Sequence, residues 1–254
     1  METKYSSGRP YVLSLAGLDP SGGAGLLADI KTFEALGVYG LGACTALTVQ
    51  TDNHFIGVEW QSATQIIAQA QPLLETYPVS YCKIGIVKDA DTLLQVITTL
   101  STIRPGIRVV LDPVLKASAG FTFHNTEQLH TWKEVLQHVY LLTPNYNEAL
   151  LLTGLSDGAA AATTLLQYCA VLLKGGHRPG AEGLDTLYTN RSITNIPAGR
   201  RSVFPKHGSG CVLSAAITAQ LAAGSSLPVA CITAKKYTEN FLASNSSLLG
   251  YHIL

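Results

Sequence analysis

One short stretch of the sequence combines glycines with a reactive side chain. It runs from His207 to Cys211 (HGSGC) and leads into the small apolar run from Val212 to Ala219. Glycines allow successive backbone N–H groups to converge on an anion where a helix begins. Cys211 would stand in the first turn of that helix, where the positive end of the helix dipole favours a thiolate. An anion site beside a base is what the transfer of a phosphoryl group to an alcohol requires.

The same stretch also fits a second interpretation. Glycines are common in tight turns that lead into buried helices, and a cysteine there can be no more than a small apolar side chain. The choice between the two interpretations depends on polar residues elsewhere in the chain.

Gln50 is the first polar side chain after an apolar strand predicted at Gly40–Val49. The carboxyl ends of parallel strands form the edge at which open α/β sheets bind ligands. The amide of Gln50 offers one acceptor beside a two-proton donor, which suits a heterocycle with a ring nitrogen next to an exocyclic amine. A polar residue that simply ends a strand is the alternative.

Two charged residues follow other predicted strands. Asp112 comes directly after Arg108–Leu111, and Lys174 comes directly after Cys169–Leu173. A carboxylate at this edge can reach magnesium or a phosphate-bound water, and a lysine can bind phosphate oxygens. The pair Asp112-Pro113 is also typical of an ordinary turn.

Asn145 and Glu148 follow the strand predicted at Val139–Leu142. Their three-residue spacing is that of a helix capping pair, so the sequence by itself predicts a capping role for both.

Strand-like and helix-like patterns alternate along the chain. Further buried strands are predicted at Tyr11–Ala16 and Tyr81–Val87, and short strand segments within Asp185–Arg201. Helices are predicted at Leu26–Leu36, from Ser62 toward Tyr77, at Ala90–Ile103 after the cap Asp89, and at Ala159–Tyr168, Cys211–Ala223 and Val229–Ser244. This alternation predicts a three-layer α/β/α fold with a mostly parallel central sheet and helices on both faces. We expect a single domain over residues 1–254.

Composition excludes several classes of function. The 17 basic and 17 acidic residues balance, and no basic stripe interleaved with aromatic residues is present, so we expect no nucleic-acid partner. Met1–Pro10 is not a signal peptide, and no apolar run approaches the roughly 20 residues needed to cross a bilayer. Five cysteines without C-x-x-C spacing and seven histidines without a close pair argue against disulfides and a transition metal. We therefore expect a soluble, cytoplasmic protein without a membrane partner.

Several segments, in this order, resemble one family closely. They are LAGLDPSGGAGLLADIKTFEALGVYG, TALTVQT, CKIGIV, VVLDPV, LLTPNYNEALLLTG, LLKGGH and HGSGCVLSAAI, which together span nearly the whole chain. The family is that of the hydroxymethylpyrimidine and phosphomethylpyrimidine kinases of thiamine biosynthesis. It belongs to the ribokinase-like superfamily and is similar to the pyridoxal kinases.

The resemblance implies a role for each matching residue. Cys211 matches the base that faces the substrate hydroxyl. The backbone of Gly208, Ser209 and Gly210 matches the anion hole. Many sugar kinases of this fold have aspartate where Cys211 stands, so the cysteine indicates the pyrimidine and pyridoxal branch.

The resemblance also implies two binding regions. Gln50 matches the glutamine that reads the aminopyrimidine ring, and further substrate-pocket positions are matched by Gly17, Ala24 and Asp29. On the nucleotide side, the acidic positions tied to magnesium and the triphosphate are matched by Asp112 and Glu148, and the remaining cofactor-binding positions by Lys174 and Gly175.

The implied reaction is in-line transfer of the ATP γ-phosphoryl group to 4-amino-5-hydroxymethyl-2-methylpyrimidine, followed by phosphorylation of the monophosphate to the diphosphate. ATP and Mg²⁺ are the implied cofactors, and relatives are commonly homodimers. A pyridoxal or pyridoxine kinase is an alternative, and a non-catalytic sensor that only binds the pyrimidine is another. The protonation state of Cys211 stays open, because a triphosphate raises the pKa of a thiol while a helix terminus and magnesium lower it.

The chain departs from the family pattern in three places. Methionine and leucine usually follow the Lys-Ile-Gly run, whereas this chain has Ile86 and Val87. Threonine usually stands between the glycines of the turn, where Ser209 keeps the hydroxyl. The ending Tyr251–Leu254 lacks the glycine and proline common in relatives. These differences bear on substrate preference more than on reaction type.

Overall fold

The computed structural model describes residues 8–115, 129–176, 180–199 and 202–253. Within them the strands form one sheet in the order β3-β2-β1-β4-β5-β6-β7-β8-β9. The strands are β1 (Tyr11–Leu18), β2 (Tyr39–Gln50), β3 (Phe55–Trp60), β4 (Tyr81–Ile84), β5 (Arg108–Leu111), β6 (Leu141–Leu142), β7 (Ala170–Leu173), β8 (Asp185–Tyr188) and β9 (Ile193–Ile196). Neighbours from β2 to β7 pair in parallel, and only β3, β8 and β9 pair antiparallel. The prediction of a mostly parallel sheet is confirmed.

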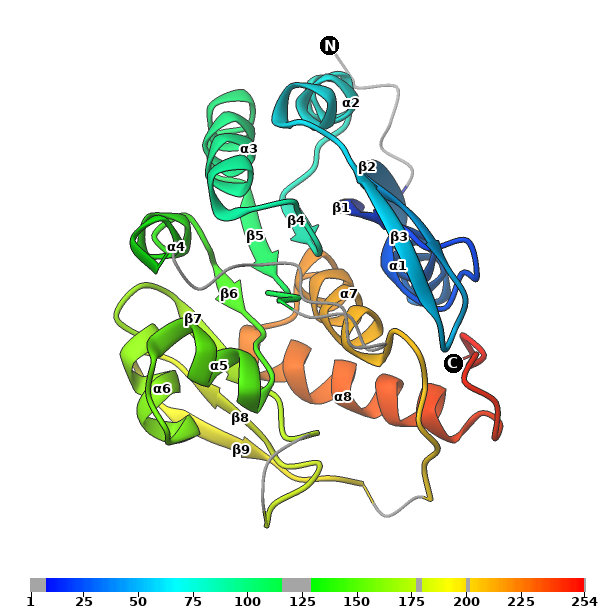
Figure 1. Cartoon of the computed structure of the whole chain (residues 1–254), viewed down its shortest axis with the longest axis vertical. Coiled ribbons are helices and arrows are strands. Elements are labelled where there is room, and N and C mark those ends of the chain that lie inside the picture. Colours follow the sequence, from blue (N-terminus) through cyan, green and yellow to red (C-terminus); the bar gives the residue numbers. More distant parts are fainter. Residues whose placement is uncertain (1–7, 116–128, 177–179, 200–201, 254) are drawn as a thin grey trace.

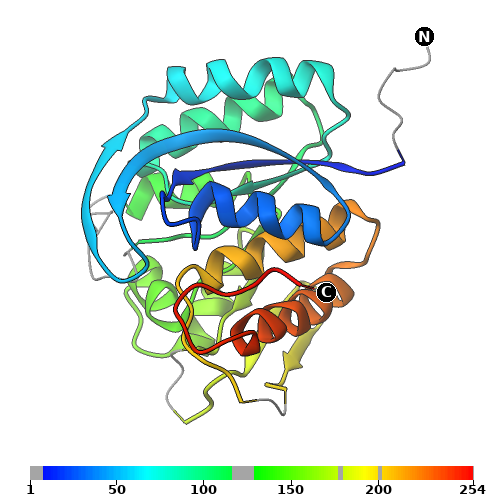
Figure 2. The ribbon, with the colours of Figure 1, turned by 90° about the vertical axis from the view of Figure 1, so that its right-hand side faces the viewer.

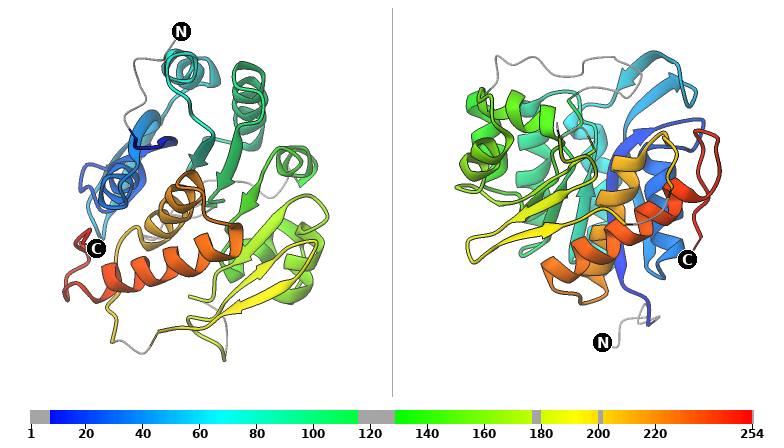
Figure 3. Two further views of the ribbon diagram at one scale, coloured as in Figure 1. Left: turned by 180° about the vertical axis from the view of Figure 1, so that it is seen from behind. Right: turned by 90° about the horizontal axis from the view of Figure 1, so that it is seen from below.

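Helices cover both faces of this sheet (Figures 1 and 3). One face packs against α2 (Ala63–Thr76), α3 (Ala90–Ile103), α4 (Leu129–Leu136), α5 (Tyr146–Thr153) and α6 (Gly158–Leu165). The other face packs against α1 (Gly25–Ala35), α7 (Ser209–Ala222) and α8 (Leu227–Ala243). Along β1, Leu13 and Leu15 point into the first layer of helices and Val12 into the second. Burial on both faces explains why the central strands are almost continuously apolar.

Side-chain caps fix where several helices begin. The Ser62 hydroxyl accepts a hydrogen bond from the backbone N–H of Gln65. In return, the side-chain oxygen of Gln65 accepts from the backbone N–H of Ser62. Asp89 caps α3 by accepting from the backbone N–H of Thr92 at 2.8 Å. Both predicted caps are confirmed, and each satisfies a helix N–H that would otherwise lack a partner.

The structure contains β3 and α4 where no element was predicted, and it also shifts the bounds of several predicted elements. The predicted strand Tyr81–Val87 ends at Ile84, because the next residues leave the ladder and the carbonyl of Ile86 accepts from the Thr45 hydroxyl at 2.6 Å. The last two helices begin earlier than predicted, so Cys211 is the third residue of α7 rather than the first.

The order of the strands creates a crevice. The chain passes from β1 to β2 on one side of β1 and places β4 on the other side, so the winding direction reverses between β1 and β4. Ligands of open α/β sheets bind at such a reversal, outside the carboxyl ends of the strands. Figure 2 shows β2 and β3 extending past the rest of the sheet as a curved ribbon beside this edge. None of the described helices has the length and apolar character needed to cross a membrane.

Candidate active site

A cavity of about 690 Å³ lies along the carboxyl edge of the sheet. Its wall includes ten of the residues that the sequence singled out, namely Gly17, Ala24, Gln50, Asp112, Glu148, Lys174, Gly208, Ser209, Gly210 and Cys211. These residues come from the ends of four different strands or the turns after them and from the first turns of α5 and α7. The sheet edge therefore brings together side chains that lie far apart in the sequence.

Two singled-out residues lie outside this wall. Asp29 is fully buried and pairs with Lys83, whose Nζ lies 2.7 Å from Asp29 Oδ2. Gly175 lies behind the wall, where its N–H donates to Asp185 Oδ1 at 2.7 Å. A Cβ at Gly175 would stand 2.1 Å from the carbonyl oxygen of Leu184, so only glycine fits.

The start of α7 is built around Gly208. Its φ of +74° is in the left-handed region, and a Cβ there would lie 2.1 Å from the carbonyl oxygen of Gly23. No side chain caps the helix, so the first-turn N–H groups have no side-chain acceptor, and Ser209 and Gly210 both line the cavity. Such a helix start provides the donors and the positive potential that an anion requires.

Asp19 and His207 join the two glycine-rich turns. His207 Nε2 lies 2.9 Å from Asp19 Oδ2, and Asp19 also accepts from the Ser21 hydroxyl at 2.8 Å and from the Ala24 N–H at 2.9 Å. Burial raises the pKa of Asp19, but the hydrogen bonds from His207, Ser21 and Ala24 outweigh burial and hold it below its ordinary value. The backbone N–H of His207 is held in turn by the Leu248 carbonyl at 2.9 Å.

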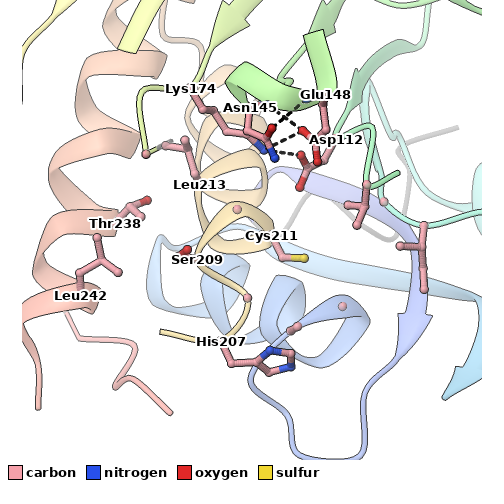
Figure 4. A pocket seen from close by; sticks show the side chains of 18 of the residues that line it. Asp112, Asn145, Glu148, Lys174, His207, Ser209, Cys211, Leu213, Thr238 and Leu242 are labelled. Carbon is pink, nitrogen blue, oxygen red and sulfur yellow. Dashed lines mark hydrogen bonds and ion pairs between the residues drawn. The ribbon is translucent and has the colours of Figure 1, made fainter. Parts of the chain in front are cut away.

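Three charged side chains meet at the opposite end of the cavity (Figure 4). Lys174 Nζ lies 2.7 Å from Asp112 Oδ1 and 4.0 Å from Glu148 Oε2. Burial raises the pKa of Glu148 to about 7; Lys174 opposes this shift and Asp112 adds to it. For Lys174, burial works against the charge, yet the two carboxylates hold its pKa above the ordinary value.

Glu148 also fulfils the capping role that its spacing predicted. Its Oε2 accepts from the Asn145 N–H at 2.7 Å, while Asn145 Oδ1 accepts from the Glu148 N–H at 2.9 Å. Glu148 therefore both caps α5 and lines the cavity, and the sequence alone could not show that it does both.

The carboxylates of Asp112 and Glu148 have the chemistry that magnesium prefers. Both are buried carboxylates that share one ammonium group, and burial, followed by the nearby charge of Asp112, raises the pKa of Glu148. Within the described ranges, no group of three or more His, Cys, Asp or Glu residues forms a metal cage. Magnesium commonly needs only one or two carboxylates because substrate phosphates complete its shell, so these two residues fit.

Cys211 lies between the charged cluster and His207 (Figure 4). Its side chain is half-buried in the cavity wall. Burial raises the pKa of the thiol, and the carboxylates of Asp29 and Asp112 raise it further, against the opposing effects of Lys83 and the Gly25 N–H. A helix terminus favours a thiolate, and the sequence left the protonation state of Cys211 open; the raised pKa favours the thiol.

Gln50 stands at the end of the cavity formed by β2 and β3. Its Nε2 donates to the Thr48 hydroxyl at 2.9 Å, and that hydroxyl donates to the Leu18 carbonyl at 2.8 Å. These two hydrogen bonds orient the amide, and Gln50 lines the cavity together with Phe55. Ile86, one of the departures from the family pattern, also forms this wall and packs where a Cβ on Gly17 would come within 2.5 Å of its Cδ1.

Sequence reasoning missed several residues of the cavity wall. Among the charged side chains they are Asp19, Lys83, Asp185, Lys235 and Glu239. Lys235 Nζ lies 2.8 Å from Asp185 Oδ2 at the side of the cavity where α8 contributes Thr238 and Leu242. The partner of each ionic contact lies far away in the sequence, so no local motif marks these pairs.

Comparison with known proteins identifies the family. The model of the phosphomethylpyrimidine kinase family matches residues 19–253. The chain belongs to the phosphomethylpyrimidine kinase family. This kinase is 38% identical over 234 residues to the hydroxymethylpyrimidine/phosphomethylpyrimidine kinase of Rhizobium meliloti (strain 1021), covering 89% of this chain and 87% of the relative. The resemblance inferred from the sequence is confirmed.

Solved structures agree with this assignment. The crystal structure of phosphomethylpyrimidine kinase from Clostridium difficile 630 superposes with a TM-score of 0.77 at 32% identity, covering 91% of this chain and 98% of that one. The pyridoxal kinase from Staphylococcus aureus in complex with ADP gives a TM-score of 0.83 at 25% identity, covering 96% and 93%. The ribokinase-like fold of this kinase is thus shared by a phosphomethylpyrimidine kinase and a pyridoxal kinase.

Proposed function

We propose that this kinase transfers the γ-phosphoryl group of ATP to the hydroxyl of 4-amino-5-hydroxymethyl-2-methylpyrimidine and then phosphorylates the monophosphate to the diphosphate, in thiamine biosynthesis. One observation carries the proposal. Cys211 and the open start of α7 lie in the same cavity, between Gln50 at one end and the Lys174–Asp112 pair at the other.

Gln50 suits the acceptor end of the cavity. The amide that Thr48 orients can accept from an exocyclic amine and donate to a ring nitrogen. Gly17 and Ala24 leave the backbone close to the ring, and Asp29 lies beneath this end. The ring would then lie against the apolar side chains of Phe55 and Ile86 in the wall.

The donor end suits a triphosphate. Lys174 offers an ammonium group, Gly175 belongs to the turn that follows it, and the N–H groups of Gly208, Ser209 and Gly210 can receive the phosphoryl oxygens. Asp112 and Glu148 would hold Mg²⁺. When bound, that ion supplies neutralisation of the triphosphate charge.

Cys211 is placed to handle the proton. The hydroxyl proton passes to the Cys211 thiolate as the alcohol oxygen bonds to the γ-phosphorus, while the bond from that phosphorus to the bridging oxygen breaks and releases ADP. The backbone groups of the α7 start stabilise the charge that develops on the transferred group. Positioning and charge neutralisation, rather than covalent chemistry, account for most of such catalysis.

A pyridoxal or pyridoxine kinase is the second candidate, favoured by the fit of the Staphylococcus aureus pyridoxal kinase to this fold. A non-catalytic sensor of the pyrimidine is the third. Purified protein with Mg²⁺ and ATP should release ADP faster with hydroxymethylpyrimidine than with pyridoxine. Faster release with pyridoxine would reverse that order, and binding of the pyrimidine without any ADP release would establish the sensor.

We further propose that residues 1–254 form one cytoplasmic kinase domain that acts as a homodimer without nucleic-acid or membrane partners. The zero net charge supports the absence of a nucleic-acid partner. Exposed apolar side chains on β2 and β3, namely Leu47, Val49 and Ile56, offer a surface for a second copy. Light scattering should give twice the mass of 26.9 kDa, and a monomer mass would contradict this part.

A further inference from the structure

Lys83 is a fully buried lysine that no motif marked as functional. It projects from β4 and forms part of the cavity wall next to Gly85. A Cβ on Gly85 would come within 2.9 Å of Lys83 Nζ, so the glycine leaves room for the ammonium group. A lysine is rarely buried without a partner, and its presence at a cavity calls for an explanation beyond packing.

Asp29 holds this lysine in place. Its Oδ2 accepts from Lys83 Nζ at 2.7 Å and from the Ser14 hydroxyl at 2.6 Å, while its Oδ1 has no partner in the described part of the chain. Two donors on one oxygen are typical of an ionised carboxylate, although burial by itself raises the pKa of Asp29. Burial also opposes the charge on Lys83, but Asp29 outweighs it and keeps the pKa of the lysine above its ordinary value.

A buried ion pair such as this one is weak evidence for a role in stability alone. Removing two charges from water costs several kcal/mol per ion, and apolar replacements of buried ion pairs are often neutral or stabilising. The pair joins α1 to β4, a contact that apolar side chains would make equally well. Its position at the cavity indicates a role in the site.

Cys211 is the reactive side chain that lines the same cavity as Lys83. The charges that face it come from four elements, Lys83 on β4, Asp29 on α1, Asp112 after β5 and Lys174 after β7. Among them the ammonium of Lys83 has the largest effect on the thiol, and it favours the thiolate, as the ammonium of Lys174 also does. The backbone N–H of Gly25 acts in the same direction.

We propose that Lys83, held by Asp29, is a positioning residue that acts through Cys211. Its buried ammonium group stabilises the negative charge on the Cys211 sulfur, so that the sulfur can take a proton from the acceptor hydroxyl despite its burial. The role of Cys211 as base rests on the proposed function, whereas the effect of Lys83 on the thiol does not.

Alkylation of the ligand-free protein tests the electrostatic claim without requiring activity. Iodoacetamide reacts with the thiolate, and mass spectrometry of peptides gives separate rates for Cys211 and for Cys44, the other cysteine that is not buried. At pH 8, Lys83→Met should slow alkylation of Cys211 by about tenfold, the result of a one-unit rise in thiol pKa. Lys83→Arg should restore most of the rate, and Cys44 should be unaffected in both variants.

A merely structural role gives the opposite sign. If Lys83 only held β4 against α1, its loss would loosen the site and speed alkylation of Cys211. If the single variant does not fold, the double variant Lys83→Met/Asp29→Asn replaces it, because it leaves no unpaired buried carboxylate. Alkylation of Cys211 in this double variant should still be slower than in wild type. Lys235→Met removes a lysine from the similarly buried pair with Asp185 and should leave the Cys211 rate unchanged.

An unchanged or faster Cys211 rate in the Lys83 variants would overturn the proposal. Failure of the proposed function has a different signature, namely a wild-type protein that releases no ADP with any acceptor while the alkylation rates follow the predicted order.

Discussion

His207 Nε2 lies 2.9 Å from Asp19 Oδ2, although 188 positions separate the two residues. Asp19 belongs to the turn after β1, and His207 precedes the first turn of α7. Both turns form the wall of one cavity, and Gly208 packs against Gly23 beside the contact. The pair thus fixes the two turns relative to each other in the cavity wall.

Asp19→Asn should lower the free energy of unfolding at pH 7 by about 1–3 kcal/mol, because a buried, multiply bonded carboxylate loses its charge-assisted hydrogen bonds. The lowered pKa of Asp19 means that its contribution is complete above pH about 4 and disappears as pH falls through the folded-state pKa. Urea unfolding at pH 7 and pH 3 measures the difference, which should shrink at the lower pH. Asp52→Asn, in the turn between β2 and β3, is the control. If Asp19→Asn had the same free energy of unfolding as wild type at pH 7, the stabilising role of the pair would be contradicted.

Of two glycine substitutions at the start of α7, one should lower stability and the other should leave it unchanged. Gly208→Ala places a Cβ 2.1 Å from the Gly23 carbonyl at positive φ, and should cost more than about 1 kcal/mol of stability. Gly210→Ala meets Lys174 Nζ at 3.4 Å and Asp112 Oδ2 at 3.6 Å, which are ordinary contacts, so the melting temperature should hold. Its methyl group occupies the phosphoryl side of the cavity, and ADP release should fall by at least roughly tenfold. Equal activity of Gly210→Ala and wild type would argue against an anion site there.

Glu148→Gln should raise the melting temperature at pH 8 when magnesium and nucleotide are absent. The pKa of Glu148 is raised to about 7, so the fold favours its protonated form and is weakened as pH rises through that value. At pH 5 the side chain is largely protonated, and the substitution should have little effect. Thermal unfolding at both pH values, with exposed Glu75→Gln as the control, measures this. A stabilisation of equal size at pH 5 and pH 8 would rule out charge burial as its cause.

Gln50→Ala should weaken binding of hydroxymethylpyrimidine by about 1–3 kcal/mol, because ring groups lose a buried polar partner. Binding of an ATP analogue should not change, since Gln50 lies at the opposite end of the cavity from Lys174. Calorimetry with each ligand separates the two, and Gln137→Ala, exposed beyond α4, serves as the control. Unaltered pyrimidine affinity would exclude the ring contact.

The sequence predicted those elements whose signals are local. Arg108–Leu111 is a short apolar run with clear boundaries, and Ser62 and Asp89 announce helix starts within a few residues. Strand β3 was not predicted, because Phe55–Trp60 is half-exposed, contains Gly57 and depends on antiparallel pairing with β2. Helix α4 was missed as well.

The candidate site was predictable only in part, for a related reason. Asp112, Lys174 and Cys211 could be predicted because they directly follow an apolar strand pattern or begin a helix pattern, and both patterns are visible in the local sequence. Lys83 and Asp19 owe their roles to partners 54 and 188 positions away, a distance that no local pattern spans. The pKa of Cys211 is raised mainly by burial, and the sequence gives no measure of how deeply a side chain is buried.

The central claim is that Cys211 acts as the base in a site that holds both substrates. Its most direct test compares ADP release by wild type and Cys211→Ala with Mg²⁺, ATP and hydroxymethylpyrimidine, using Cys44→Ala as the control. We expect the rate to fall by roughly 10²- to 10⁴-fold while calorimetry shows little change in pyrimidine affinity. A Cys211→Ala variant with the wild-type rate would contradict the account.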